Sequence, residues 1–142
     1  MSDTPLILHA TAVAVQGRAL LIRGASGRGK SGLALEMMAR GAQLVADDRV
    51  VIEHDGAGGL TASAPAPLRG LIEARGLGLL GADAVERAEL VAVLDLDHEE
   101  TDRLPPQRHT VLLNVTLPLL HKSASPTFPA ALVQYLRRDR RA

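Results

Sequence analysis

Residues 24–31 read Gly-Ala-Ser-Gly-Arg-Gly-Lys-Ser and complete the G-x-x-x-x-G-K-[ST] pattern of a phosphate-binding loop. Such a loop binds polyphosphates because successive backbone N–H groups form an anion-binding nest, to which the following helix adds the positive end of its dipole. Lys30 can reach the β- and γ-phosphates of a nucleotide, and the Ser31 hydroxyl can ligate Mg²⁺. A glycine-rich turn that binds nothing is the alternative. We expect nucleotide binding by Gly24, Ala25, Ser26, Gly27, Arg28, Gly29, Lys30 and Ser31.

Two adjacent carboxylates, Asp47 and Asp48, end the apolar segment 43–46. In phosphate-loop folds, the strand after the loop helix commonly lies beside the loop strand, and its C-terminal edge faces the same crevice. A carboxylate at that edge can hold Mg²⁺ or accept the proton of an acceptor hydroxyl. From residue type alone, it is equally open whether the two carboxylates belong to a site or only form a turn.

Other charged residues could belong to the same site. Glu73 and Arg75 lie in the glycine-rich segment 68–81, where they could form a site loop or only a surface salt bridge. His9 lies in the first apolar segment, and Arg103 lies in a polar loop. For both residues, position alone favours a surface or structural role.

An acidic run follows the apolar segment 89–96 and contains one histidine, His98. Because no second histidine stands at metal-ligand spacing, we interpret this run as a solvated loop. Its members are Asp95, Asp97, His98, Glu99 and Glu100.

The pattern of apolar residues predicts the elements that position these side chains. It indicates a β-hairpin over 6–23, a helix over 31–40, strands over 43–46, 49–54, 60–64, 89–96 and 110–116, and a terminal helix over 130–141. Residues 68–81 suit neither a regular helix nor a strand, 97–109 is expected to form a polar loop, and 118–129 is expected to be irregular. Because strands dominate, we expect one α/β domain over 1–142 with a mixed sheet and few helices.

Composition excludes several classes of function. Of 142 residues, 46% are hydrophobic and 23% are charged, as in globular proteins. Basic and acidic residues number 16 each, so no domain-wide positive field favours nucleic acid, and one Phe, one Tyr and no Trp leave few stacking platforms. The lack of cysteine excludes disulfides, thiolate metal sites and cysteine nucleophiles. Without a signal-like or membrane-spanning apolar run, we expect a cytoplasmic location and no membrane contact.

Several segments together resemble the catalytic domain of the HPr kinase/phosphorylase family. The matching positions keep the family order from residue 9 to residue 104. They are His9, the loop 24–31, the phrase Leu-Val-Ala-Asp-Asp-Arg-Val at 44–50, Ile-Glu-Ala-Arg-Gly-Leu-Gly at 72–78, and Asp-Arg-Leu at 102–104.

The resemblance implies a bacterial serine kinase that phosphorylates HPr, the phosphocarrier of the sugar phosphotransferase system. Such kinases use Mg²⁺ and ATP, and many also use pyrophosphate as donor or remove the phosphate with inorganic phosphate. The implied fold is α/β and related to the nucleotide domain of phosphoenolpyruvate carboxykinases. Family members are typically hexamers, so the expected partners are an HPr-like phosphocarrier and further copies of this chain.

The resemblance also implies roles for single residues. Lys30 and Ser31 would bind phosphates and metal, and Glu73 would be the second metal residue. Asp48, with Asp47 beside it, would be the base for the serine hydroxyl and the acid in the reverse reaction.

His9 and Arg103 match further residues of the family active site. Because His9 lies almost at the start, the chain resembles a short form without the family's separate N-terminal domain. After Pro118 the family has a basic, glycine-containing loop linked to dephosphorylation, which residues 119–126 do not match. We therefore expect efficient phosphorylation of the phosphocarrier and poor dephosphorylation.

A nucleotide-sensing module that keeps the phosphate loop without turnover is the alternative from another class. Intact Lys30, Ser31, Asp48 and Glu73 favour the kinase. A GTPase would show Asn-Lys-x-Asp, which the sequence lacks, and a nucleotide kinase would need an arginine-rich lid, whereas arginines between 49 and 110 are scattered.

Overall fold

The computed structural model describes residues 4–141 as a strand-rich domain with two helices. Neither helix is long and apolar enough to cross a membrane. In chain order the elements are β1 (Leu6–Leu8), β2 (Thr11–Val15), β3 (Arg18–Arg23), α1 (Lys30–Met38), β4 (Gln43–Ala46), β5 (Val50–His54), β6 (Leu60–Ser63), the 3₁₀ helix η1 (Ala66–Leu68), β7 (Leu71–Ala74), β8 (Gly78–Gly81), β9 (Arg87–Glu99), β10 (Arg108–Leu112), β11 (Val115–Lys122) and α2 (Phe128–Arg138).

Most strands form one mixed sheet with the order β1-β5-β6-β9-β3-β2-β4. The long strand β9 runs parallel to β3 on one side, and on its other side it pairs first with β6 and then with β11. β10 extends the sheet beyond β11. The expected α/β class, with a mixed sheet and few helices, is confirmed.

The sheet topology brings the loop strand and the strand before the aspartate pair to one edge. β2 lies between β3 and β4 and is antiparallel to both, so β3 and β4 run in the same direction. The expectation that the strand over 43–46 lies beside the loop strand is therefore wrong. The C-terminal ends of both strands nevertheless meet at one edge, because the intervening strand reverses direction.

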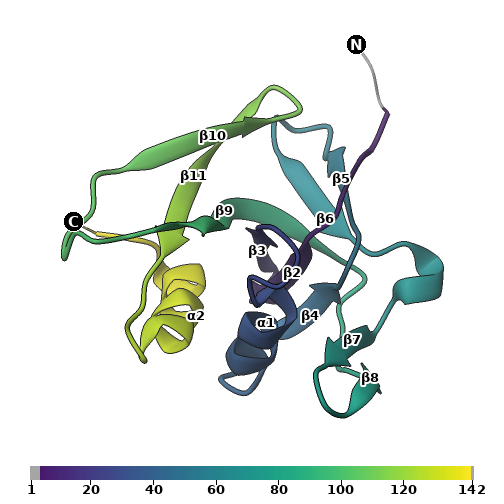
Figure 1. The fold of residues 1–142 in the computed structure, drawn as a ribbon. Helices are drawn as coiled ribbons and strands as arrows, with labels where there is room; N and C mark the ends of the chain where they lie inside the picture. Colours follow the sequence, from purple (N-terminus) through teal and green to yellow (C-terminus); the bar gives the residue numbers. More distant parts are fainter. Residues whose placement is uncertain (1–3, 142) are drawn as a thin grey trace.

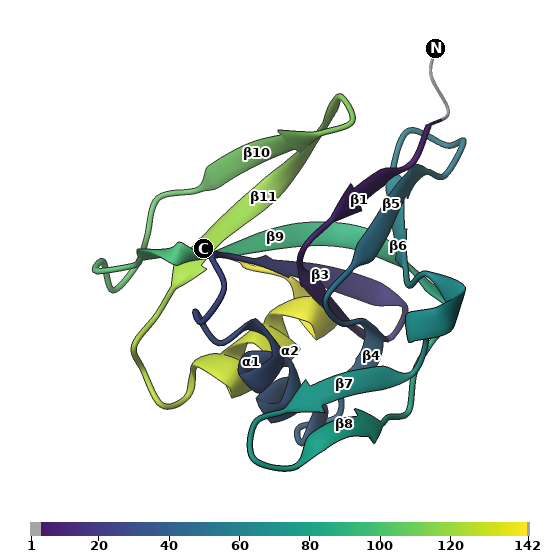
Figure 2. The same ribbon diagram turned by 45° about the vertical axis from the view of Figure 1, so that its right-hand side comes forward.

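Two apolar layers cover the two faces of the sheet. α1 and α2 lie side by side against one face, where Met37 and Leu136 pack with Ile22 (Figure 1). On the other face the sheet curls, with β10 and β11 rising on one side and β5 and β6 on the other (Figure 2), and Leu21 and Val93 are buried there. Because β2 and β3 are covered on both faces, their sequences are continuous apolar runs rather than alternating ones.

Residues 68–81 contain a regular hairpin, so the prediction of an irregular segment is wrong. β7 and β8 pair antiparallel as a small separate sheet. Ile72 and Ala74 are buried, and Gly76, at φ +90°, lies in the turn. The glycines hid the strand pattern because they supply this turn and the exposed strand β8 rather than breaking the hairpin.

Two strands, β10 and β11, replace the single strand predicted over 110–116. The prediction of an irregular segment over 118–129 is wrong for 118–122, which belong to β11, and for 128–129, where α2 begins. Leu113 and Asn114 connect them with φ values of +46° and +65°. Pro118 lies inside β11, one residue before the parallel pairing with β9 begins. The sequence lacks the Asn-Gly pair that usually marks such a turn, so the hairpin was missed.

Candidate active site

The phosphate loop connects β3 to α1, as the sequence predicts. Gly29 precedes the helix at φ +91°, and its carbonyl accepts the Leu33 N–H at 2.9 Å. Lys30 Nζ donates to the carbonyl oxygens of Gly24 at 2.8 Å and Ala25 at 3.3 Å. The ammonium group is therefore held across the loop, where its charge can complement an anion.

Asp47 is buried at the end of β4, with 6% of its surface exposed. Its Oδ1 accepts hydrogen bonds from the Thr11 hydroxyl at 2.8 Å and the Ser31 hydroxyl at 2.7 Å, and its Oδ2 accepts the Glu73 N–H at 3.0 Å. One carboxylate thus joins the start of β2, the first turn of α1 and β7.

The oxygen atoms at this position fit Mg²⁺. Mg²⁺ in nucleotide sites takes one or two carboxylates and completes its octahedron with phosphate oxygens and water. The Ser31 hydroxyl and the carboxylates of Asp47 and Glu73 are such donors. Within residues 4–141 no three or more His, Cys, Asp or Glu side chains form a group that could hold a metal. Bound Mg²⁺ would neutralise phosphate charge.

Asp48 has the opposite environment from its neighbour. Its φ of +71° lies in the left-handed region, which Asp tolerates better than most residues, and its side chain is 58% exposed. Its Oδ1 lies 2.8 Å from His9 Nε2, and its Oδ2 lies 3.9 Å from Arg49 Nε. An accessible carboxylate held by a histidine can accept a proton from an incoming hydroxyl.

A cleft of about 400 Å³ brings most of the predicted site residues together. Sequence reasoning left Arg75 open and missed Thr11, whose only signal was its position at the start of β2. The lining residues are His9, Thr11, Ser26, Gly27, Gly29, Lys30, Ser31, Gly32, Leu35, Asp47, Asp48, Glu73 and Arg75.

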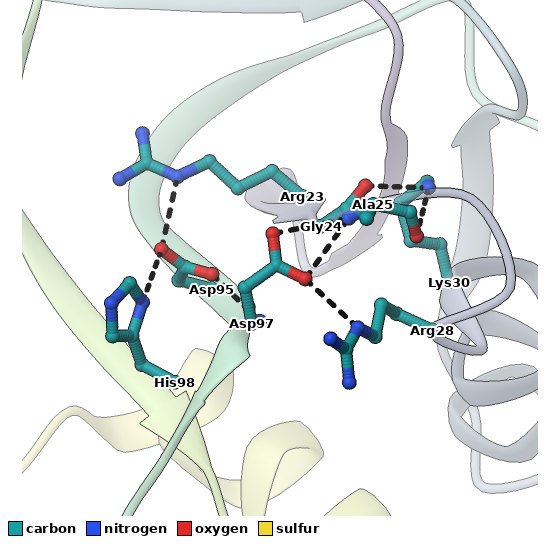
Figure 3. Close-up of polar contacts among 8 residues, drawn as sticks. All are labelled: Arg23, Gly24, Ala25, Arg28, Lys30, Asp95, Asp97 and His98. Atoms are coloured by element: carbon teal, nitrogen blue, oxygen red, sulfur yellow. Dashed lines mark hydrogen bonds and ion pairs between the residues drawn. The ribbon is translucent and has the colours of Figure 1, made fainter.

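Four predicted residues do not line this cleft. Gly24, Ala25 and Arg28 lie on the side of the loop that contacts the end of β9 (Figure 3). Arg103 lines another cavity, of about 520 Å³, between segment 100–108, β11 and α2. No residue lines both cavities, so within one chain the structure does not bring Arg103 to the phosphate loop.

The interpretation of the acidic run as a solvated loop is wrong, because Asp95, Asp97, His98 and Glu99 lie in β9 and Asp95 is buried. Asp95 is 8% exposed and accepts the Asp97 N–H at 2.8 Å, with His98 Nδ1 at 3.1 Å and Arg23 Nε at 3.8 Å (Figure 3). Burial alone would raise the pKa of Asp95, but the Asp97 N–H, His98 and Arg23 together hold this pKa below its ordinary value.

Comparison with known proteins gives consistent matches. The family profile described as HPr Serine kinase C-terminal domain matches residues 4–120. An HPr kinase/phosphorylase of Brevibacillus brevis is 35% identical over 131 residues, covering 84% of this chain and 42% of that protein. An HPr kinase/phosphorylase from Geobacillus kaustophilus is 41% identical over 125 residues, covering 80% of this chain and 40% of that protein. The chain thus spans about two fifths of the length of these curated relatives.

The fold also matches a solved structure. The Hpr(Ser) kinase/phosphatase from Coxiella burnetii superposes with a TM-score of 0.77 over 93% of this chain and 94% of that one. Its sequence is 22% identical, so this match shows a shared fold.

Proposed function

The chain belongs to the HPr serine kinase C-terminal domain family, and from this membership we propose that it is an ATP-dependent protein-serine kinase acting on an HPr-like phosphocarrier. The observation that carries the proposal is the pair of aspartates in the phosphate-loop cleft. Asp47 is buried against Ser31, while Asp48 is exposed in the same cleft. From the family alone we extend the proposal to a cytoplasmic homo-oligomer.

The phosphate loop supports nucleotide as the phosphoryl donor. Its backbone precedes α1, whose dipole favours an anion at the N-terminus, and Lys30 adds a full positive charge. Ser31 and Glu73 would hold Mg²⁺, with Asp47 behind them orienting the Ser31 hydroxyl. This set of groups is suited to ATP, and to pyrophosphate, which presents the same phosphate chemistry.

Asp48 is proposed as the base for the acceptor. The serine Oγ of the phosphocarrier attacks the γ-phosphorus, the bond from that phosphorus to the bridging oxygen breaks, and ADP leaves. The serine proton passes to an Asp48 oxygen, and the contact with His9 Nε2 orients that carboxylate. In the reverse direction protonated Asp48 returns the proton to the serine oxygen. Arg75, which lines the same cleft, could contact the transferred group.

Labelled ATP and a purified HPr-like protein test the proposal. Wild type should transfer label to the phosphocarrier. Asp48→Asn should bind ATP with unchanged affinity but transfer label at least about a hundredfold more slowly, because an amide cannot accept the proton. Binding of ATP by the wild type without any transfer would support the nucleotide-sensing alternative instead.

A further inference from the structure

Asp97, at the end of β9, contacts the phosphate loop at two points (Figure 3). Both of its carboxylate oxygens lie 3.1 Å from the Ala25 nitrogen and accept that N–H, and Oδ1 lies 3.2 Å from Arg28 Nε. The backbone N–H of Arg28 in turn donates to the Ala25 carbonyl at 3.1 Å. Residues 25–28 therefore form a closed turn whose two ends are held by one carboxylate.

The backbone of Asp97 is held by a residue of the same strand. The Asp97 N–H donates to buried Asp95, which also contacts Arg23, the residue just before the loop. The loop starts close against β9, because a Cβ placed on Gly24 would lie only 3.1 Å from Leu96 Cβ. The first half of the loop is therefore fitted to the end of β9.

These contacts hold the Asp97 carboxylate on the β9 side of the loop, outside the phosphate cleft. The phosphate cleft is lined by Gly27, Gly29, Lys30 and Ser31, and Asp97 does not line it. Asp97 therefore does not occupy the phosphate position. Its contacts order the segment that precedes the nest, so less conformational entropy is lost when an anion binds.

We propose that Asp97 is a positioning residue for nucleotide binding, which fixes the first turn of the phosphate loop through the Ala25 N–H and the Arg28 guanidinium. The assignment rests on the proposed function only in taking the loop to bind a nucleotide. Removing the carboxylate leaves the turn 25–28 without its charge-assisted contacts, so the nest must be ordered by the ligand itself.

The affinity of the whole chain for MgATP, measured by titration calorimetry, tests this role. Asp97→Ala should weaken binding about tenfold, since both contacts of the carboxylate with the loop are lost, together with the ordering that they give. Asp97→Asn should lose less, because an amide oxygen still accepts the Ala25 N–H. Arg28→Gln should weaken MgATP binding as much as Asp97→Asn does. The double variant with both substitutions should lose no more affinity than either single variant. Glu99→Ala, an exposed carboxylate two residues further along β9, is the matched control and should bind like wild type.

Other outcomes overturn the inference. Wild-type affinity in a folded Asp97→Ala protein would do so, as would a lowered melting temperature with unchanged affinity, which marks a purely structural residue. No MgATP binding by the wild type would remove both this role and the proposed kinase. Binding that depends on Asp97 without any transfer to a phosphocarrier would contradict the kinase alone and support the role of Asp97.

Discussion

Asp47 and Asp48 show how one peptide unit can place two identical side chains in opposite environments. Asp47 directly follows β4, and its side chain is buried among Thr11, Ser31 and the Glu73 N–H. The left-handed backbone at Asp48 turns the next carboxylate out toward the cleft. The dipeptide alone left a turn and a site equally open, and only the backbone conformation separates their environments.

Replacing Lys30 tests the charge of the loop. Lys30→Ala should reduce phosphoryl transfer by about two to three orders of magnitude, because the charge developing on the transferred group loses its nearest ammonium. Steady-state kinetics at saturating ATP measure this effect. Lys122→Ala, which removes the other lysine of the chain at the exposed end of β11, should leave the rate unchanged. Near-normal turnover in folded Lys30→Ala would rule out the role.

Ser31 and Glu73 are expected to set the Mg²⁺ requirement. Ser31→Ala and Glu73→Gln should each raise the Mg²⁺ concentration needed for half-maximal activity by about tenfold, since the first removes an oxygen ligand and the second replaces a charged ligand with a neutral one. The measurement is a Mg²⁺ titration at fixed ATP. Glu86→Gln, at an exposed position before β9, is the matched control. Unchanged half-saturation in the Glu73 variant would leave Glu73 as a structural residue.

Asp95 should make stability depend on acid pH. Its folded-state pKa is below the ordinary value, so the ionised group stabilises the protein at neutral pH, and that contribution is lost as pH falls below about 4. The free energy of unfolding of Asp95→Asn should be lower at pH 7 and should fall less between pH 5 and 3. Asp55 and Glu100 also have lowered pKa values, so the free energy of unfolding of Asp95→Asn should still fall somewhat between pH 5 and 3. Urea denaturation at several pH values measures this dependence. An equal fall in the free energy of unfolding of wild type and Asp95→Asn between pH 5 and 3 would contradict the role of Asp95.

Elements fixed by local residue patterns could be predicted, and those fixed by distant pairings could not. The loop 24–31 with its flanking strand and helix follows from one short pattern, and the structure confirms it. The insertion of β2 between β3 and β4 depends on pairings that no local pattern specifies. Asp97 was missed for the same reason, because it contacts Ala25 across 72 positions of the chain.

The packing of α2 against the sheet gives a prediction about stability. Leu136 is fully buried, and its carbonyl accepts the Arg18 Nε–H at 2.8 Å. Leu136→Ala should lower the free energy of unfolding by about 2–5 kcal/mol through lost burial and the cavity left behind. Leu77→Ala, at a leucine that is 80% exposed, should change it by less than about 0.5 kcal/mol. Urea denaturation of both variants provides the comparison, and similar losses would show that α2 contributes little packing energy.

At the scale of the whole molecule, one sheet edge collects groups from six parts of the chain. They are the segment from His9 to the start of β2, the ends of β3, β4 and β9, the start of α1 and the hairpin β7–β8, and they surround or support the phosphate loop. Arg103 lies in the other cavity, so its predicted catalytic role stays a prediction. The weak dephosphorylation expected from residues 119–126 likewise stays a prediction, and pyrophosphate release from the phosphoserine form of the phosphocarrier would measure it.

The central claim is that this cleft phosphorylates a serine of an HPr-like protein with Asp48 as base. Mass spectrometry of such a phosphocarrier after incubation with ATP, Mg²⁺ and this protein tests it most directly. The account predicts one added phosphoryl group on a serine with wild type and none with Asp48→Asn over the same time. An unmodified phosphocarrier despite ATP binding by the wild type, or equal modification by Asp48→Asn, would contradict it.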